Sequence, residues 1–112
     1  MPRFVVLRHE KEGGAHFDLM LENQGVLLTF SFAALPSAGA SCERIFDHRL
    51  EYLDIEGELG EQKGRVGRVE RGTFDLLALD DEALHVYLRG ERLSGGFRLV
   101  KQAGDAWVLD AE

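Results

Sequence analysis

The sequence has little that would place the chain in a membrane or in an oxidising compartment. Its single cysteine, Cys42, has no second cysteine for an internal disulfide, which favours a reducing compartment. The longest apolar runs, such as VLLTFSFAAL, are too short and too polar to span a bilayer. The N-terminal stretch MPRFVVLRHE lacks the apolar core and cleavage site of a secretory signal. We therefore expect a cytoplasmic protein with no membrane partner.

Positive charge is also scarce. The formal net charge is -7, so the field of the whole chain repels nucleic-acid backbones at long range. The best candidate for a local basic patch is the segment EQKGRVGRVERG, with Lys63, Arg65, Arg68 and Arg71. Because Glu61 and Glu70 are interleaved with these residues, we favour an exposed hairpin of mixed charge over a nucleic-acid surface.

Long amphipathic helices are missing, and the dominant period is two. Alternating strand patterns occur in RFVVLRH, HFDLMLE, GVLLTFSF, GRVERGTFDLLAL, ALHVYLRG, GGFRLVKQ and AWVLDAE. Turn residues separate them, and only SCERIFDHRLEY could hold a helical turn. With 112 residues the chain forms a single domain, residues 1–112. Short strands and 13 glycines predict an all-β antiparallel barrel or sandwich.

One predicted strand carries polar side chains on a single face. In HFDLMLE, one face carries Phe17, Leu19 and Leu21, and the other carries His16, Asp18, Met20 and Glu22. His9 ends the preceding strand, and a hairpin through Gly13-Gly14 returns the chain beside it. Two histidines and a carboxylate suit a divalent transition metal and leave positions open for water or substrate. These ligands must be deprotonated, so binding should weaken as the pH falls through the histidine range.

A second group of residues lies in Asp47-His48-Arg49-Leu50-Glu51-Tyr52. His48 and Tyr52 are four residues apart, so they can project to one side in an extended segment or in a helical turn. A histidine can donate to a phosphate oxygen or act as a general acid, and a tyrosine hydroxyl can orient it or the substrate.

Both groups also have a structural interpretation. Every half-buried strand has a polar face, so His16 and Asp18 could simply meet water. His48 and Tyr52 could be a satisfied histidine beside a buried tyrosine. Cys42 is interpreted as a packed thiol rather than a nucleophile, because no basic partner is near it in the sequence.

The order of these motifs resembles the 3′-phosphoesterase domain of bacterial DNA ligase D, which also occurs as a free-standing protein. That family opens with a strand ending in histidine, a short turn, and a His-Tyr-Asp stretch running into Arg and Glu; here RFVVLRH and HFDLMLE match it. A strand like GVLLTFSFAALPS follows, and then an acidic-Asp-His-Pro-Leu-Glu-Tyr segment ending in Glu-Gly, here FDHRLEYLDIEG. GRVGRVERGTF and LRGERLSGGFRLVK are similar to later features, so the resemblance covers nearly the whole chain.

The resemblance implies a compact, closed antiparallel β-barrel whose crater holds a divalent metal ion, manganese first and zinc second. It implies a hydrolase of DNA repair that trims ribonucleotides and phosphates from the 3′ ends of DNA strands. By position, His9, His16 and Asp18 hold the metal, His48 contacts the scissile phosphate, Tyr52 supports the site, and Glu22 matches a family glutamate. A monomer is the default, and a repair ligase or polymerase is a candidate protein partner.

The departures from the family concern its basic residues. Met20 stands where the family has a phosphate-binding arginine, and a thioether cannot supply a bidentate, charged contact. A family lysine falls on Ala34, and a further arginine falls near Ala40. Arg44 or Arg49 could replace them in space.

Two functional hypotheses follow. The first is a metal-dependent 3′-phosphoesterase acting on nucleic-acid 3′ ends, with weak activity or an altered substrate because of Met20. The alternative is a catalytically degraded barrel that binds metal or a protein partner without hydrolysing phosphoesters.

Overall fold

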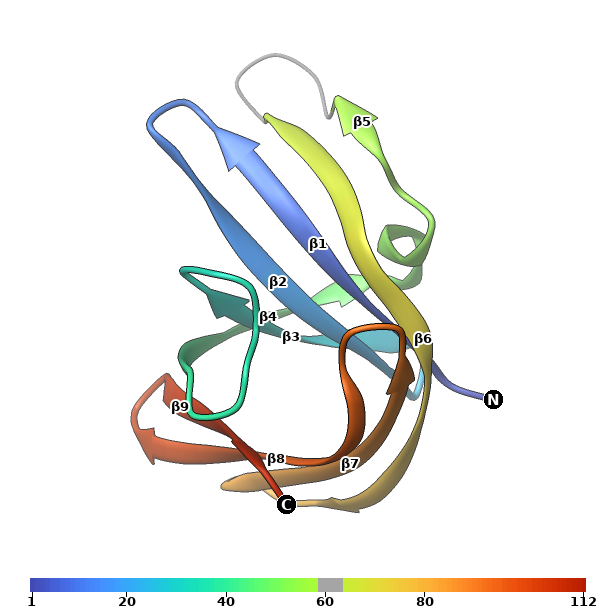
Figure 1. The fold of residues 1–112 in the computed structure, drawn as a ribbon, viewed down its shortest axis with the longest axis vertical. Helices are drawn as coiled ribbons and strands as arrows, with labels where there is room; N and C mark the ends of the chain where they lie inside the picture. Colours follow the sequence, from blue (N-terminus) through green and yellow to red (C-terminus); the bar gives the residue numbers. More distant parts are fainter. Residues whose placement is uncertain (59–63) are drawn as a thin grey trace.

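The chain folds into an antiparallel β-barrel, as a computed structural model describes it for residues 1–58 and 64–112 (Figure 1). Lys63 and Glu61 of the predicted basic segment lie outside the described residues. The strands within them are β1 (Arg3–Lys11), β2 (Gly14–Asn23), β3 (Val26–Phe32), β4 (Ser41–Arg49), β5 (Gly57–Glu58), β6 (Arg65–Leu79), β7 (Ala83–Gly90), β8 (Ser94–Ala103) and β9 (Ala106–Ala111).

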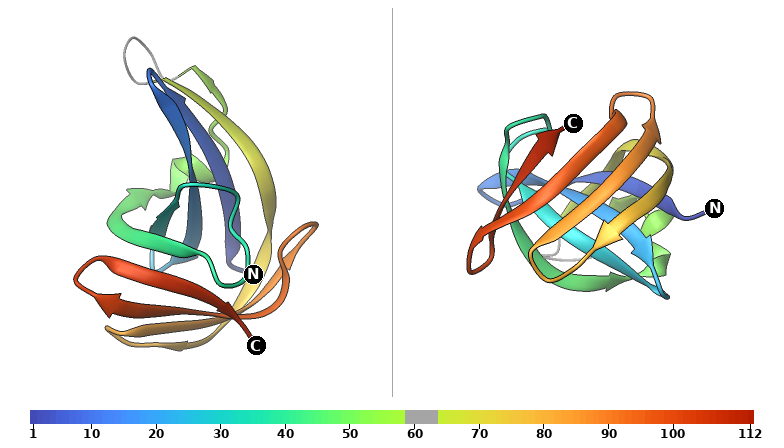
Figure 2. Two further views of the ribbon diagram at one scale, coloured as in Figure 1. Left: turned by 60° about the vertical axis from the view of Figure 1, so that its left-hand side comes forward. Right: turned by 90° about the horizontal axis from the view of Figure 1, so that it is seen from below.

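The strands form one sheet that closes on itself. Their order is β1-β2-β3-β4-β9-β8-β7-β6-β5, and a further pairing joins β1 to β6. The first half of the long strand β6 pairs with β1, and its second half pairs with β7. The short strand β5 pairs with the start of β6, outside the closed ring. The predicted all-β closed antiparallel barrel is therefore confirmed, and Figure 2 shows it from two further directions.

Short turns produce the predicted hairpins. Between β2 and β3 the chain reverses through Gln24 and Gly25, both with positive φ (50° and 84°), a conformation that glycine adopts without steric cost. Between β6 and β7, the Asp80 carboxylate accepts hydrogen bonds from the backbone N–H groups of Glu82 and Ala83. The strand patterns read from the sequence thus match real strands to within a few residues.

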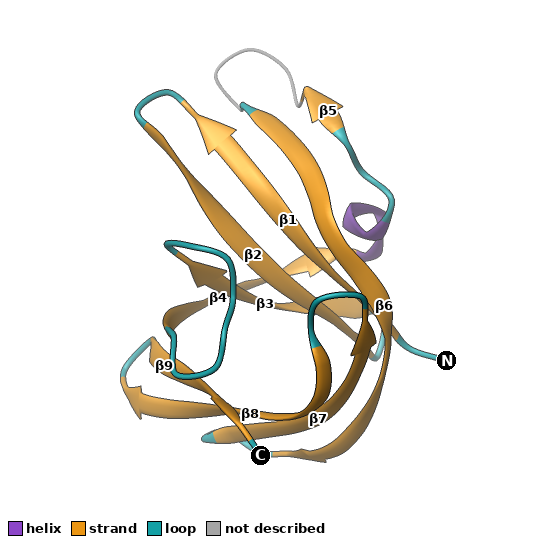
Figure 3. Ribbon diagram, in the orientation of Figure 1, coloured by secondary structure: helices purple, strands orange, loops and turns teal. Residues whose placement is uncertain are grey.

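The segment with a suspected helical turn is mostly strand. Residues 41–49 form β4, which pairs with β3 and β9, and only Leu50–Leu53 form a single 3₁₀ turn, η1 (Figure 3). No helix in the described part of the chain is long and apolar enough to cross a membrane.

Two apolar clusters lie on opposite faces of the first strands. Phe4 and Val6 of β1 point into the barrel, where a large cluster includes Phe30, Trp107 and residues of β7 to β9. The alternate residues of β1 point outward and join a smaller cluster, which consists of Val5, Leu7, Met20, Leu27, Leu53 and Val66. We call this side of β1, β2, β3 and β6 the outer face. Leu53 of η1 packs on it, and the candidate site lies on the same face.

Candidate functional site

His9, His16 and Asp18 come together on the outer face. His9 and His16 are direct partners in the β1–β2 register, and Asp18 follows on the same side of β2. One potential ligand atom from each residue lies within 4.8 Å of the others. The β1–β2 turn, with Gly13 at φ 91°, closes the hairpin that brings the histidines together.

The distances fit ligands of one metal ion. His16 Nε2 and Asp18 Oδ2 are 3.2 Å apart. Two neighbouring ligands about 2.1 Å from a shared ion would lie roughly 3.0–3.4 Å apart. The His9 and His16 rings meet edge to face, with centroids 4.9 Å apart. Two imidazoles and a carboxylate are a donor set that zinc and manganese accept.

One oxygen of the Asp18 carboxylate lacks a hydrogen-bond partner among the described residues. Its residue is only 5% exposed, and Oδ1 is buried without a hydrogen-bond partner among the described residues. Burying an unpaired carboxylate oxygen is costly, so such an atom calls for an explanation. A cation held by His9, His16 and Asp18 would satisfy it.

His48 is fixed in one orientation. Its Nδ1 lies 3.0 Å from Oγ1 of Thr29 and 3.0 Å from the carbonyl oxygen of Phe46. The Thr29 hydroxyl donates its hydrogen to the Leu27 carbonyl oxygen, so its oxygen is left as an acceptor. Both neighbours of Nδ1 accept, and Nδ1 therefore carries the proton, an assignment made from the hydrogen-bond pattern. Nε2 is therefore the ring nitrogen that can contact a further group.

Aromatic rings flank His48 on two sides. The Tyr52 ring meets it edge to face, with centroids 5.1 Å apart and an interplanar angle of 86°. The Phe46 ring stacks nearly parallel to it, at 4.7 Å and 13°. The structure thus brings His48 and Tyr52 together, as the spacing of four residues allowed, because β4 ends at Arg49 and η1 turns the chain back.

Met20 and Thr29 lie between the two groups. They are partners in the β2–β3 register, and Asp18 is the partner of Ser31, two residues along β3. One strand spacing and two residues of strand place the backbones of Thr29 and Asp18 roughly 8 Å apart. Met20 is 1% exposed and packs in the outer apolar cluster. Along β2 and β3, Met20 therefore separates the position of Asp18 from that of Leu27, the β3 partner of His48.

The other residues singled out from the sequence lie elsewhere. Glu22 is at the far end of β2, where its Oε1 accepts a 2.9 Å hydrogen bond from the backbone N–H of Arg3. Cys42 is buried among the interior residues, and burial raises the pKa of its thiol to about 12, in agreement with a packed thiol.

The guanidinium groups of Arg44 and Arg49 are both engaged with other side chains. The Arg44 guanidinium lies over the rings of Phe30 and Trp107, 5.6 and 5.4 Å from their centroids. Arg49 pairs through Nε with Oε1 of Glu51 at 2.8 Å. Neither residue therefore provides a strong positive charge at the edge of the candidate site.

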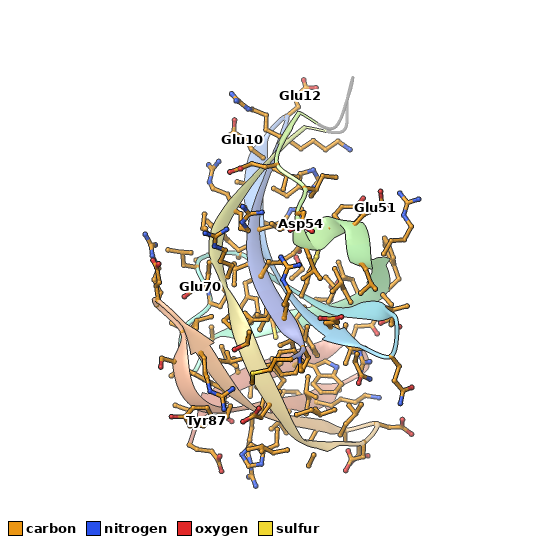
Figure 4. The ribbon with its side chains drawn as sticks, turned by 90° about the vertical axis from the view of Figure 1, so that its right-hand side faces the viewer. Glu10, Glu12, Glu51, Asp54, Glu70 and Tyr87 are labelled. Atoms are coloured by element: carbon orange, nitrogen blue, oxygen red, sulfur yellow. The ribbon has the colours of Figure 1, made fainter. Side chains whose placement is uncertain are left out.

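The described members of the basic segment lie among acidic residues. Arg65 and Arg68 line one surface hollow together with Glu10 and Glu56, and Arg68 and Arg71 line another together with Glu70 and Glu91. Arg65 pairs in register with Glu10, on the opposite side of β6 from Val66 and Arg68. Arg68 donates to the Leu53 carbonyl oxygen at 3.4 Å. Acidic side chains also lie on this side of the molecule: Glu10 and Glu12 are near the β1–β2 tip, and Glu51 on η1 and Asp54 just after it lie further from the tip (Figure 4).

Comparison with known proteins decides the family. A model of the family described as the DNA Ligase D 3′-phosphoesterase domain matches residues 7–101, which include His9, His16, Asp18, His48 and Tyr52. The chain belongs to this family. The resemblance seen in the sequence is thereby confirmed.

Curated relatives carry this domain within much longer proteins. The multifunctional non-homologous end joining protein LigD of Mycobacterium bovis is 29% identical over 116 residues, which cover 94% of this chain and 15% of the relative. The LigD protein of Pseudomonas aeruginosa is 29% identical over 111 residues, covering 88% of this chain and 13% of the relative. The chain thus spans only a small fraction of the length of these relatives.

Proposed function

We propose that this domain is a divalent-metal-dependent 3′-phosphoesterase that acts on nucleic-acid 3′ ends in DNA repair. The observation that carries the proposal is the cluster of His9, His16 and Asp18, in which the buried Asp18 Oδ1 lacks a partner among the described residues. Family membership supports the reaction class. The names of the LigD relatives support the repair setting.

His9, His16 and Asp18 would hold the metal ion. Bound there, a divalent ion would supply Lewis-acid chemistry, polarising a phosphoryl oxygen and acidifying water. Manganese is the first choice and zinc the second, since both accept nitrogen and oxygen donors.

His48 would act on the phosphate from the other side of Met20. Because Thr29 and the Phe46 carbonyl keep the proton on Nδ1, Nε2 is a base in the neutral ring and a donor in the charged ring. In the charged form, Nε2–H would donate to a phosphate oxygen as negative charge develops. Tyr52, edge to face with His48, would hold that ring in place.

The proposal is tested by metal binding and turnover together. Calorimetry with Mn²⁺ and Zn²⁺ at neutral pH should show binding to the parent protein and none to His16→Ala. Phosphate release from a DNA strand with a 3′-phosphate should need the metal, and should fall at least a hundredfold in His48→Ala. Equal turnover by His16→Ala, His48→Ala and the parent would refute the proposal.

A second function is favoured by Met20. Its 1% exposed thioether stands where the family has a phosphate-binding arginine, and the net charge is -7. A barrel that binds metal or a protein partner without hydrolysis is the corresponding alternative. It predicts metal binding without turnover by the parent. Met20→Arg separates the two: a large gain in phosphate release would show that only the phosphate clamp has been lost.

A further inference from the structure

Phe46 is an unusual residue to find beside the proposed phosphate site. It is 76% exposed, more than any other large apolar side chain in the described residues except Met1. A single exposed apolar residue needs no explanation by itself. The position of the Phe46 ring does need an explanation, because one of its faces is stacked on His48 and its remaining surface is open to water.

The stack is accompanied by hydrogen-bond contacts to the same histidine. The two rings are 4.7 Å apart with an interplanar angle of 13°. Nδ1 of His48 also lies 3.0 Å from the carbonyl oxygen of Phe46, and Thr29 holds the same nitrogen from β3. Backbone and side chain of Phe46 are therefore tied to the histidine that would contact the phosphate.

The surroundings of Phe46 do not resemble an apolar protein interface. Its neighbour Asp47 is exposed, and the nearby Arg49 and Glu51 side chains are 79% and 58% exposed and paired with each other. Apolar protein surfaces would have to desolvate these charges. A flat aromatic ligand that covers only the ring would not.

We propose that the outer face of the Phe46 ring stacks on the nucleobase of the 3′-terminal nucleotide. This inference rests on the proposed function, because it takes His48 as the residue that contacts the 3′-phosphate. Base and 3′-phosphate are carried by the same sugar, so a phosphate at Nε2 of His48 brings its own base to the neighbouring ring. Every base has a π face, so stacking would accept any terminal nucleotide.

Stacking would also allow this chain to bind a nucleic-acid end with few positively charged side chains. Basic side chains bind a nucleic acid through its backbone phosphates. Met20 cannot make such a contact, and the net charge of -7 disfavours backbone binding. Base stacking on an aromatic ring needs no cation. The domain would therefore recognise a single exposed 3′-terminal nucleotide rather than a long stretch of duplex.

The test is binding of a single-stranded oligonucleotide that ends in a 2-aminopurine nucleotide with a 3′-phosphate, in chelator so that no turnover occurs. We expect quenched 2-aminopurine fluorescence with the parent, binding about tenfold weaker in Phe46→Leu, and recovery in Phe46→Trp. The matched control is Tyr87→Leu, which removes an aromatic ring that is 44% exposed on β7 and should bind as the parent does. A strand with an abasic 3′ terminus should bind the parent about as weakly as the base-bearing strand binds Phe46→Leu.

The inference is overturned if Phe46→Leu binds the 2-aminopurine strand as tightly as the parent, or if the parent binds this strand no better than the abasic one. Phosphate release in Mn²⁺ is measured separately. Base-dependent binding without release supports the stacking and counts against the proposed function. Phosphate release without any preference for a terminal base supports the proposed function and refutes the stacking.

Discussion

Thr29 fixes the proton of His48. The Thr29 hydroxyl oxygen lies 3.0 Å from Nδ1 of His48, while the hydroxyl hydrogen is donated to the carbonyl oxygen of Leu27. Thr29 is fully buried, so water does not compete for this arrangement. A buried acceptor that orients a histidine ring is a positioning group, and its loss should leave the cluster of His9, His16 and Asp18 intact.

Thr29→Val removes this acceptor with little change of shape. We expect metal binding to be unchanged and turnover of a 3′-phosphate to fall about tenfold, because the Phe46 carbonyl still holds Nδ1–H but the ring is less well oriented. Nitrogen NMR of His48 should show a mixture of tautomers in place of one. Thr29→Ser keeps the hydroxyl and is the control. Parent-like rates and a single tautomer in Thr29→Val would show that Thr29 has only a packing role.

Metal should stabilise the fold. An ion that binds only the folded protein at a hundred times its dissociation constant adds about 2.7 kcal/mol to the free energy of unfolding. For a chain of this size we expect Mn²⁺ or Zn²⁺ to raise the melting temperature by about 10 °C. The increase should vanish in His16→Ala and in Asp18→Asn.

His85→Ala is the matched control for the metal experiment. His85 lies on β7 and pairs with Glu112, away from the triad. Its loss should leave the metal-induced increase in melting temperature unchanged. An increase that persists in His16→Ala, or that disappears in His85→Ala, would place the ion somewhere other than at His9, His16 and Asp18.

The cluster of His9, His16 and Asp18 could be predicted from the sequence because its geometry is local. Alternation along one strand placed His16 and Asp18 on one face, and a short glycine turn set His9 opposite His16. His48 and Tyr52 were also found from spacing. Strand β4 was missed, because its pairing with β9 joins residues more than 60 positions apart, which a local pattern does not reveal.

Contacts between distant strands explain what the sequence did not predict. Thr29 gave no signal of its own, since a threonine on a strand is ordinary until β4 brings His48 to it. Met20 looked out of place on a polar face. The reason for an apolar residue there is the outer cluster, which Leu53 of η1 completes from another part of the chain.

Met20 is consequently a stabilising residue of the outer cluster. Met20→Arg would bring a guanidinium into contact with Val5, Leu7 and Leu27. Burying an unpaired charge should lower the free energy of unfolding by about 3 kcal/mol. Met20→Leu, of similar volume, should cost less than about 1.5 kcal/mol. Denaturant unfolding of both variants checks this, and equal stability of Met20→Arg and the parent would show that the arginine reaches water.

Glu70 on β6 holds the turn between β7 and β8. Its residue is 6% exposed, and its carboxylate accepts hydrogen bonds from the backbone N–H groups of Arg71, Glu91, Arg92 and Leu93. Burial by itself would raise the pKa of Glu70, but these donors outweigh it and hold the pKa below the usual 4.5. From the sequence, Glu70 was only a charge interleaved with arginines.

Acid should therefore loosen the β7–β8 turn. The pKa of Glu70 is depressed in the folded state, so its contribution to stability is complete above about pH 4.5 and is lost as the pH falls through the lower, folded-state pKa. Glu70→Gln removes the charge and sets an amide N–H₂ against backbone donors, which should cost about 2–3 kcal/mol at neutral pH.

Unfolding free energies of the parent and of Glu70→Gln, measured from pH 7 to pH 3, should converge as the pH falls. Glu91→Gln is the control, because only its backbone N–H takes part in the described turn contacts with Glu70. A gap between the parent and Glu70→Gln that stays constant down to pH 3 would mean that the ionised carboxylate is not what holds the turn.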